Sequence, residues 1–437
     1  MAARARRSNR PRAADFTTPL TIPGGAVGGA DVVRELAPDV ALPVWQTLRS
    51  VLMWAGEEPA LRGDLFEPCA MEEWEAELLM DTWEPDVRCP LAVLVGELAR
   101  AAEASAETLA RTCLCVTDWA LERGHVATAL AFAEAAALSW PQQSRYSWMA
   151  GRLLRIHGRP KEAEQWLKRA ERAASTSKDW EARTLALNSL GNTYAEAGNY
   201  KHAIQMHTQA LRVAKKHGLR EREGEVLHDL FVATAYSGSR EAAEEHARGA
   251  LEVYRSGHPR LLALAHDVAV LWMQHGQFSR ALPVFLEISG HFTEPHERLL
   301  VIASTARAAG ACGEEELYTK LAQEAVTVEQ QVPAARLAPR ALYHLGLGAW
   351  SLNRWAMAEQ FLMRAESAAR ERNEADVTSE AEAALSAVRQ RQHAEQKGMY
   401  SERKKAGQET LSGRFVATLK SAPELFTEGV LINRRAA

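Results

Sequence analysis

The sequence predicts an all-α protein built as a solenoid, in which helical hairpins stack on one another in chain order. Three observations predict this class. Apolar residues recur at helical spacing along most of the chain, glycines break that pattern at regular intervals, and small or apolar residues recur at fixed places after each break. A single hairpin cannot bury its apolar face alone, so such units are expected to stack and share one continuous core.

Residues 184–217 show the hairpin most clearly. A first helix carries an apolar stripe at one-turn spacing, a glycine ends it, and small residues stripe a second helix. The residues concerned are Leu187, Leu190, Gly191, Tyr194, Gly198, Ala203, His207 and Ala210. This pattern resembles the tetratricopeptide repeat (TPR), W-x2-L-G-x2-Y followed by A-x3-F and A. The unit is similar to the peptide-binding members with long repeats, and the resemblance implies a right-handed α-solenoid.

Seven units share this pattern when the turn glycine and the small residues of the second helix are aligned. They start near residues 110, 144, 184, 224, 262, 299 and 339, at intervals of 34 to 40 residues. Small residues let the next hairpin approach closely, and glycine relaxes the turn because it has no Cβ. The match is weak only in unit six, where Tyr318 replaces the expected alanine, so we expect a local distortion there.

The remaining segments differ in composition from the array, which we place at residues 107–374. Residues 1–35 are rich in Arg, then in Pro and Gly, and predict a disordered basic tail, with an organelle transit peptide as the alternative. Residues 36–106 predict a helical N-terminal region. Residues 375–397 keep the helical period without the second-helix pattern, as a solvating cap helix does. Residues 398–437 predict a flexible tail with one weak helix.

Composition excludes several classes of function. The net charge of −4 gives no general attraction to nucleic acid, which we disfavour as a partner, or to a membrane surface. No run of 18 apolar residues is present, and five cysteines without a CxxC pair predict reduced thiols in a cytoplasmic protein. The sequence has no Gly-rich phosphate loop, HExxH or paired-cysteine motif. We therefore expect no catalytic residue, no metal site, no cofactor and no membrane partner.

Candidate binding residues follow from the resemblance, because the first helices of TPR units line the concave groove. The positions carried over are Arg152, Arg155, Asn188, Asn192, Glu225, His228, Asp229, His266, Asp267 and Tyr343. Asn188 and Asn192 lie one turn apart, so their amides can donate to and accept from the backbone of an extended peptide. The alternative is that each asparagine only supports a helix–helix contact. Glu225 and Asp229 disfavour a C-terminal carboxylate as the ligand.

Two further features leave alternatives open. His228-Asp229 and His266-Asp267 recur at equivalent places in units four and five. Such pairs occur in metal-dependent phosphohydrolases, but no further ligand falls at the right spacing, which favours groove or core positions. Residues 71–83 predict an acidic amphipathic helix that either packs on its neighbours or occupies the groove as an intramolecular ligand.

The sequence as a whole predicts a non-catalytic scaffold or adaptor that binds a protein or peptide in the concave groove. The alternative is a regulator that senses a peptide and passes the closure of its superhelix to an effector or to transcription. The sequence does not fix the oligomeric state.

Overall fold

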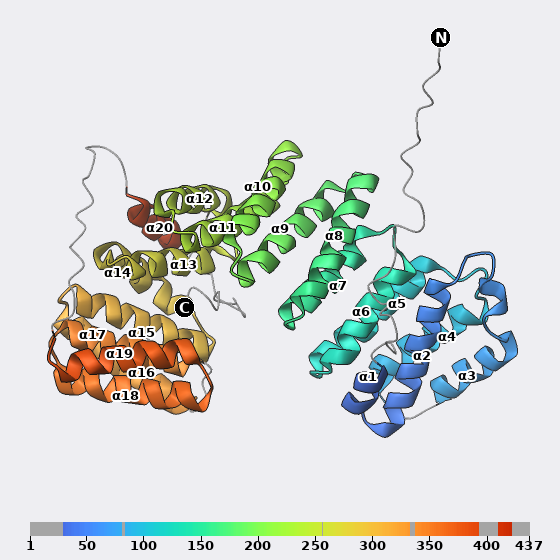
Figure 1. Ribbon diagram of the computed structural model, residues 1–437, viewed down its shortest axis with the longest axis horizontal. Coiled ribbons are helices and arrows are strands. Elements are labelled where there is room, and N and C mark those ends of the chain that lie inside the picture. Colours follow the sequence, from blue (N-terminus) through green and yellow to red (C-terminus); the bar gives the residue numbers. More distant parts are fainter. Residues whose placement is uncertain (1–28, 81–83, 256, 333–336, 393–409, 422–437) are drawn as a thin grey trace, which may run out of the picture. The chain divides into compact units, whose positions relative to one another are not determined.

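The computed structural model describes residues 29–80, 84–255, 257–332, 337–392 and 410–421. Within these ranges the chain forms α-helices and short 3₁₀ turns, with no β-strand (Figure 1). The helices pack as consecutive pairs, so the prediction of an all-α solenoid is confirmed. The chain divides into two compact units, Met1–Arg222 and Glu223–Ala437, which are described separately below.

The helices follow one another with short turns in both units. The first unit contains α1 (Gly29–Glu35), α2 (Pro38–Gly56), α3 (Pro68–Met80), α4 (Pro85–Ala99), α5 (Ala106–Glu122), α6 (Val126–Ser139), α7 (Ser144–Ile156), α8 (Pro160–Ser177), α9 (Trp180–Glu196) and α10 (Tyr200–Lys216). Helix α11 (Arg220–Tyr236) leads into the second unit, which continues with α12 (Arg240–Tyr254), α13 (Leu261–Gln274), α14 (Phe278–Ile288), α15 (Pro295–Ala311), α16 (Glu315–Gln331), α17 (Ala338–Ser351), α18 (Trp355–Glu371), α19 (Ala375–Arg389) and α20 (Leu411–Lys420).

Seven hairpins run from α5–α6 to α17–α18 among the described helices, as the sequence predicts. Their turns use left-handed backbone conformations, with φ of 78° at Gly198 and 57° at Asn353, which glycine and asparagine adopt at low cost. Glycine also makes room inside a hairpin. A Cβ placed on Gly191 of α9 would lie 2.4 Å from the His207 ring of α10, so the buried imidazole depends on this glycine.

Tyr318 does not distort hairpin six. Helix α16 continues through it, and the phenol is buried, with its hydroxyl donating to the Leu345 carbonyl oxygen at 2.9 Å. The neighbouring hairpin makes room for the ring, because a Cβ on Gly348 would lie 2.7 Å from Tyr318. The expected distortion is therefore wrong, and the larger residue is matched by a glycine one hairpin later.

The prediction that residues 1–35 form a disordered tail is wrong for its last seven residues. Gly29–Glu35 is helix α1, and it packs on α2 and α6. Its Glu35 carboxylate accepts from the backbone N–H groups of Ala127 and Thr128 at 3.0 and 2.9 Å. These N–H groups belong to the first turn of α6, where a carboxylate is stabilised by unpaired donors and by the helix dipole. Residues 1–28 lie outside the described residues.

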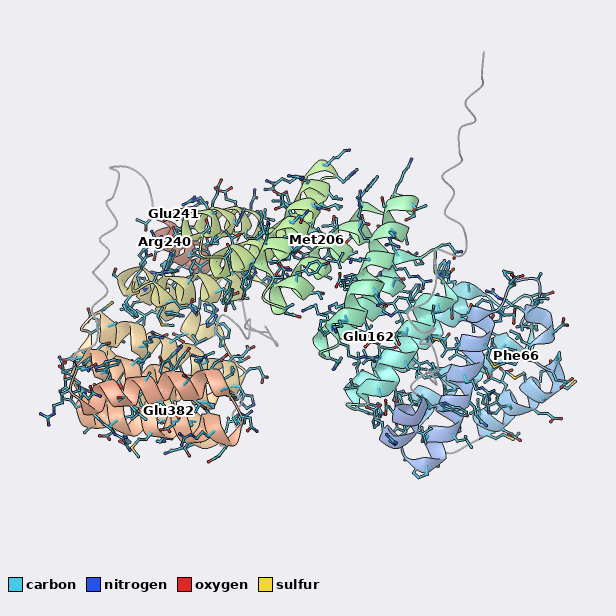
Figure 2. All side chains as sticks on the ribbon, viewed as in Figure 1. Phe66, Glu162, Met206, Arg240, Glu241 and Glu382 are labelled. Carbon is cyan, nitrogen blue, oxygen red and sulfur yellow. The ribbon has the colours of Figure 1, made fainter. Side chains whose placement is uncertain are left out.

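The acidic segment predicted at 71–83 is helix α3, which packs on α4. Met71 and Leu78 are buried. Phe66, labelled in Figure 2, is partly buried and packs against the same core. A Cβ on Gly96 of α4 would lie 2.6 Å from the Glu75 carboxylate, so the two helices approach closely. This arrangement is the packed helix, not the groove ligand; residues 81–83 lie outside the described residues.

Two helices follow the last hairpin. Helix α19 lies where a cap helix is predicted, ends at Arg389, and packs on α17 and α18. Its Glu382 pairs with Arg370 at 2.6 Å (Figure 2). Residues 411–420 lie in the segment predicted as a flexible tail with one weak helix, and they form helix α20, which packs against α14. A buried phenylalanine at position 415 anchors this helix.

Candidate functional site

A hollow opens between α11 and α13, the first helices of hairpins four and five. Its empty space, counted together with the adjoining open solvent, is about 370 Å³. Its lining is mostly apolar and carries polar groups from both helices; the residues are Phe231, Val232, Ala235, Tyr236, Asp267, Val270, Leu271, Gln274 and His275. Concave, largely apolar surfaces with a few placed polar groups are typical ligand sites, so this hollow is our candidate site.

Asp267 is the charged group of the hollow and is only 3% exposed. One of its oxygens accepts from His228 Nε2 of α11 at 3.0 Å, and the other accepts from His266 Nδ1 at 3.3 Å. Burial acts to raise the pKa of Asp267, but the hydrogen bonds from the two imidazoles outweigh it and hold the pKa below its ordinary value. The carboxylate is therefore ionised at neutral pH.

The two histidines act as donors inside the protein. Since an ionised carboxylate only accepts, each ring points an N–H at Asp267. His266 is fully buried, with Phe285 and Phe292 edge-on to its ring at 6.1 and 6.4 Å. Its Nε2 has no hydrogen-bond partner among the described residues. The histidines thus hold the carboxylate in place and lie in or near the core.

Helix α13 explains how the hollow is placed. Every residue from Leu261 to Met273 is buried, so this helix lies in the centre of its unit. Its polar positions His266 and Asp267 consequently lie inside the protein. The apolar lining residues Val270 and Leu271 were not among the predicted site residues, because an apolar residue on an apolar helix gives no sequence signal of a ligand.

Two of the predicted residues of the first unit, Asn188 and Arg155, contact a neighbouring helix. Asn188 Oδ1 lies 2.7 Å from His207 Nδ1 of the same hairpin, which is the helix–helix contact given above as the alternative. Arg155 of α7 pairs with Glu196 of α9, and Arg152 lies over the Trp148 ring at 6.0 Å. Asn192 is half-buried on α9. Contact of these residues with a peptide backbone stays a prediction.

The other predicted residues of the second unit lie outside the lining of the hollow. Glu225 Oε1 is 3.7 Å from Arg260 Nε. Burial acts to lower the pKa of Arg260, but the nearby carboxylates of Asp229 and Glu225 outweigh it and leave that pKa raised. Tyr343 on α17 stacks with Arg340 at 5.7 Å. Of the ten predicted residues, the structure brings together His228 of α11 with His266 and Asp267 of α13. The sequence analysis had paired each histidine only with the aspartate next to it in the chain.

No group of three His, Cys, Asp or Glu side chains in the described ranges is arranged to hold a metal ion. In the pairs that suggested a metal, Asp267 takes both histidines, and Asp229 of the first pair stays apart from them. No helix in the described parts is long and apolar enough to cross a membrane.

Part of this chain is similar to a known repeat family. Residues 151–216, which contain hairpin three, match the family model described as tetratricopeptide repeat. Comparison with curated proteins finds no significant match.

Three solved structures are similar to parts of the chain. TPR-like repeats of a putative kinesin light chain from Podosopora anserina are 20% identical, with a TM-score of 0.39, over 44% of this chain and 98% of that one. The apo form of RapI is 11% identical, with a TM-score of 0.41, over 64% of this chain and 98% of that one. Aspartyl phosphate phosphatase F from Bacillus subtilis is 10% identical, with a TM-score of 0.37, over 81% and 96%.

Proposed function

We propose that this chain is a non-catalytic scaffold that holds a protein or peptide partner at the hollow between α11 and α13. One observation carries the proposal: the buried carboxylate of Asp267 lies among apolar side chains of α11 and α13. TPR hairpins stack into extended binding surfaces, and this hollow lies on the helices that the family uses for its ligands.

The chemistry of the hollow favours a cationic side chain of the partner. Phe231, Val270 and Leu271 offer an apolar wall to an aliphatic stem, while Asp267 offers a negative charge to the head group. Each carboxylate oxygen accepts one hydrogen bond from an imidazole and has a second lone pair free to accept from a ligand. A charge shielded from water attracts its partner more strongly than one on the surface. Lysine or arginine of a peptide matches this combination.

The same geometry disfavours catalysis. His228 is 7% exposed and His266 is fully buried, so the two imidazoles that contact Asp267 are directed at the carboxylate and not at bound substrate. General acid–base catalysis needs such a group within hydrogen-bond reach of the reacting atom. The regulator that couples peptide binding to an effector stays a prediction, since no contact in the structure favours it over the scaffold.

A photo-crosslinking experiment tests the proposal. A benzoylphenylalanine at Gln274, an exposed residue of the hollow, is introduced into the full chain in its native cells. A matched control carries the same group at Glu245, an exposed residue of α12 outside the lining. We expect a specific protein adduct from position 274 and not from 245.

Asp267→Asn in the position-274 background tests the charge. We expect the adduct to decrease at least about tenfold, because a buried charge loses its partner. Identical adducts from both positions would contradict binding at the hollow. An adduct that forms only at 274 and is unchanged by Asp267→Asn would contradict the cationic side chain alone.

A further inference from the structure

Helix α20 packs against helices that lie far from it in the chain, whereas the helices of the repeats pack on those next to them in order. It packs against α14 and lies beside α12, both of them second helices of their hairpins (Figure 1). Its Arg414 pairs with Glu252 of α12 at 3.3 Å, across 162 residues of sequence. Hairpin five, made of α13 and α14, packs directly on α15 of hairpin six. The stacking of the array is therefore complete without α20.

The contact has the form of an amphipathic helix in a groove. Leu411, Phe415 and Leu419 are buried and recur every four residues, so they lie on one face of α20. The Phe415 ring meets Trp272 edge-on, with centroids 6.5 Å apart and an interplanar angle of 84°. Thr410 caps the helix by accepting from the Gly413 N–H at 3.1 Å.

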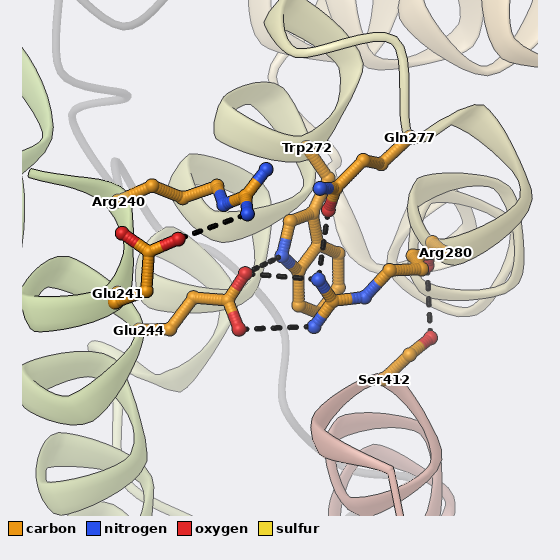
Figure 3. Close-up of polar contacts among 7 residues, drawn as sticks. All are labelled: Arg240, Glu241, Glu244, Trp272, Gln277, Arg280 and Ser412. Atoms are coloured by element: carbon orange, nitrogen blue, oxygen red, sulfur yellow. Dashed lines mark hydrogen bonds and ion pairs between the residues drawn. The ribbon is translucent and has the colours of Figure 1, made fainter. Parts of the chain in front are cut away.

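Polar contacts among α12, α13 and α14 hold the surface on which α20 lies (Figure 3). Glu244 of α12 accepts two hydrogen bonds from the Arg280 guanidinium, at 2.9 and 3.1 Å, and one from Trp272 Nε1 at 3.0 Å. Arg280 also donates to Gln277 Oε1 at 2.7 Å and lies over the Trp272 ring at 4.3 Å. Bidentate arginine–carboxylate pairs of this kind fix geometry.

A hydrogen bond joins this polar cluster to α20. Ser412 Oγ donates to the Arg280 carbonyl oxygen at 2.8 Å, and the guanidinium of Arg280 faces away from the contact toward Glu244 (Figure 3). If α20 leaves, the Glu244–Arg280 pair keeps its partners, so no buried charge is left alone. A helix of ten residues is marginal by itself in water, which means that α20 is helical because it is docked.

We propose that the groove formed by α12, Trp272 and α14 is a second interaction surface, which binds an amphipathic helix of a partner protein, and that α20 is its intramolecular occupant. The partner helix carries apolar residues at positions i, i+4 and i+8 and a small hydroxyl residue at i+1, the pattern of Leu411, Phe415, Leu419 and Ser412. A segment of the same chain competes at an effective concentration on the order of 1 mM, so a partner binds only when it exceeds that competition.

A synthetic peptide with the sequence of residues 410–421 and a fluorescent label is the probe, added to the full chain. Phe415→Ala in the chain removes the central anchor of the resident helix. We expect the peptide to bind this variant at least about tenfold more tightly than the unaltered chain. The matched control, Lys420→Ala, changes an exposed residue of α20 and is expected to bind like the unaltered chain. A peptide that itself carries the Phe→Ala change is expected not to bind.

The proposal is wrong if the Phe415→Ala chain keeps its helical circular dichroism and melting transition and still does not bind the peptide. Hydrogen exchange of the unaltered chain gives an independent decision if that variant does not fold. We expect the amides of α20 to exchange at least about 100-fold faster than those of α13, as segments that open locally do. Equal protection of the two helices would identify α20 as a permanent part of the core.

Discussion

Glu134 in the first unit and Asp267 in the second are both buried acids, 5% and 3% exposed, and they ionise differently. Glu134 of α6 accepts one hydrogen bond, from Trp166 Nε1 at 2.8 Å, and burial raises its pKa to about 7. Asp267 accepts from two imidazoles, and its pKa is lowered. The comparison teaches that the number of donors around a carboxylate, more than its burial, decides whether the array holds a charge inside.

The largest expected effect is that of Asp267→Ala. It removes the acceptor for both His228 and His266, and each buried polar group left unsatisfied costs about 1–3 kcal/mol. We expect the free energy of unfolding, measured by urea titration at pH 7, to fall by about 4 kcal/mol. Asp267→Asn keeps an acceptor oxygen and serves as the control, with a loss less than half as large. Equal losses in the two variants would mean that the two hydrogen bonds do not stabilise the pair of helices.

A pH series on Glu134→Gln separates the two acids. The pKa of Glu134 is above its ordinary value of 4.5, so its contribution favours folding below that pH and is lost as the pH rises through about 7. The glutamine keeps the acceptor for Trp166 and does not titrate. We expect both chains to be similar at pH 5 and the variant to be more stable at pH 8, on the order of 3 kcal/mol.

The measurement is urea unfolding at both pH values. For Asp267→Asn we expect the opposite dependence of stability on pH. The lowered pKa of Asp267 stabilises the native chain above the unfolded value of about 3.9, and this contribution is lost only as the pH falls through the still lower native pKa. A Glu134→Gln difference that does not change between pH 5 and 8 would show that Glu134 is ionised as Asp267 is.

The smallest expected effect is that of Asn188→Ala, which tests the polar pair of hairpin three. Asn188 makes a hydrogen bond with His207 from a half-buried side chain, and one such bond corresponds to about 1 kcal/mol. Unfolding in urea at pH 7 measures the loss. A loss as large as that of Asp267→Ala would remove the distinction between the two regions.

The sequence predicts the hairpins well because their determinants are local. A turn glycine such as Gly198 and small second-helix residues such as Ala203 and Ala210 act within one unit, and their spacing is visible along the chain. The candidate site is predicted less well. His228 pairs with Asp267, 39 residues away, and not with its neighbour Asp229. That pairing depends on how far α11 and α13 are rotated, which residue spacing does not fix.

Helix α20 illustrates a second gap. Its three apolar residues form too short a pattern to separate a docked helix from a solvated one. What orders the segment is Trp272 and the Glu244–Arg280 pair, which lie more than 130 residues earlier. The accommodation of Tyr318 by Gly348 has the same cause, since each residue departs from the repeat pattern and only the contact between them explains both.

The burial of α13 on every side also limits how this protein can be re-engineered. Repeats whose helices each have a solvent-exposed polar face can be duplicated, reordered or removed as modules. A chain cut directly before or after hairpin five would expose a helix with no hydrophilic side to turn outward. Hairpin five therefore needs a hairpin on each side, and libraries built by shuffling the array should keep it between its present neighbours.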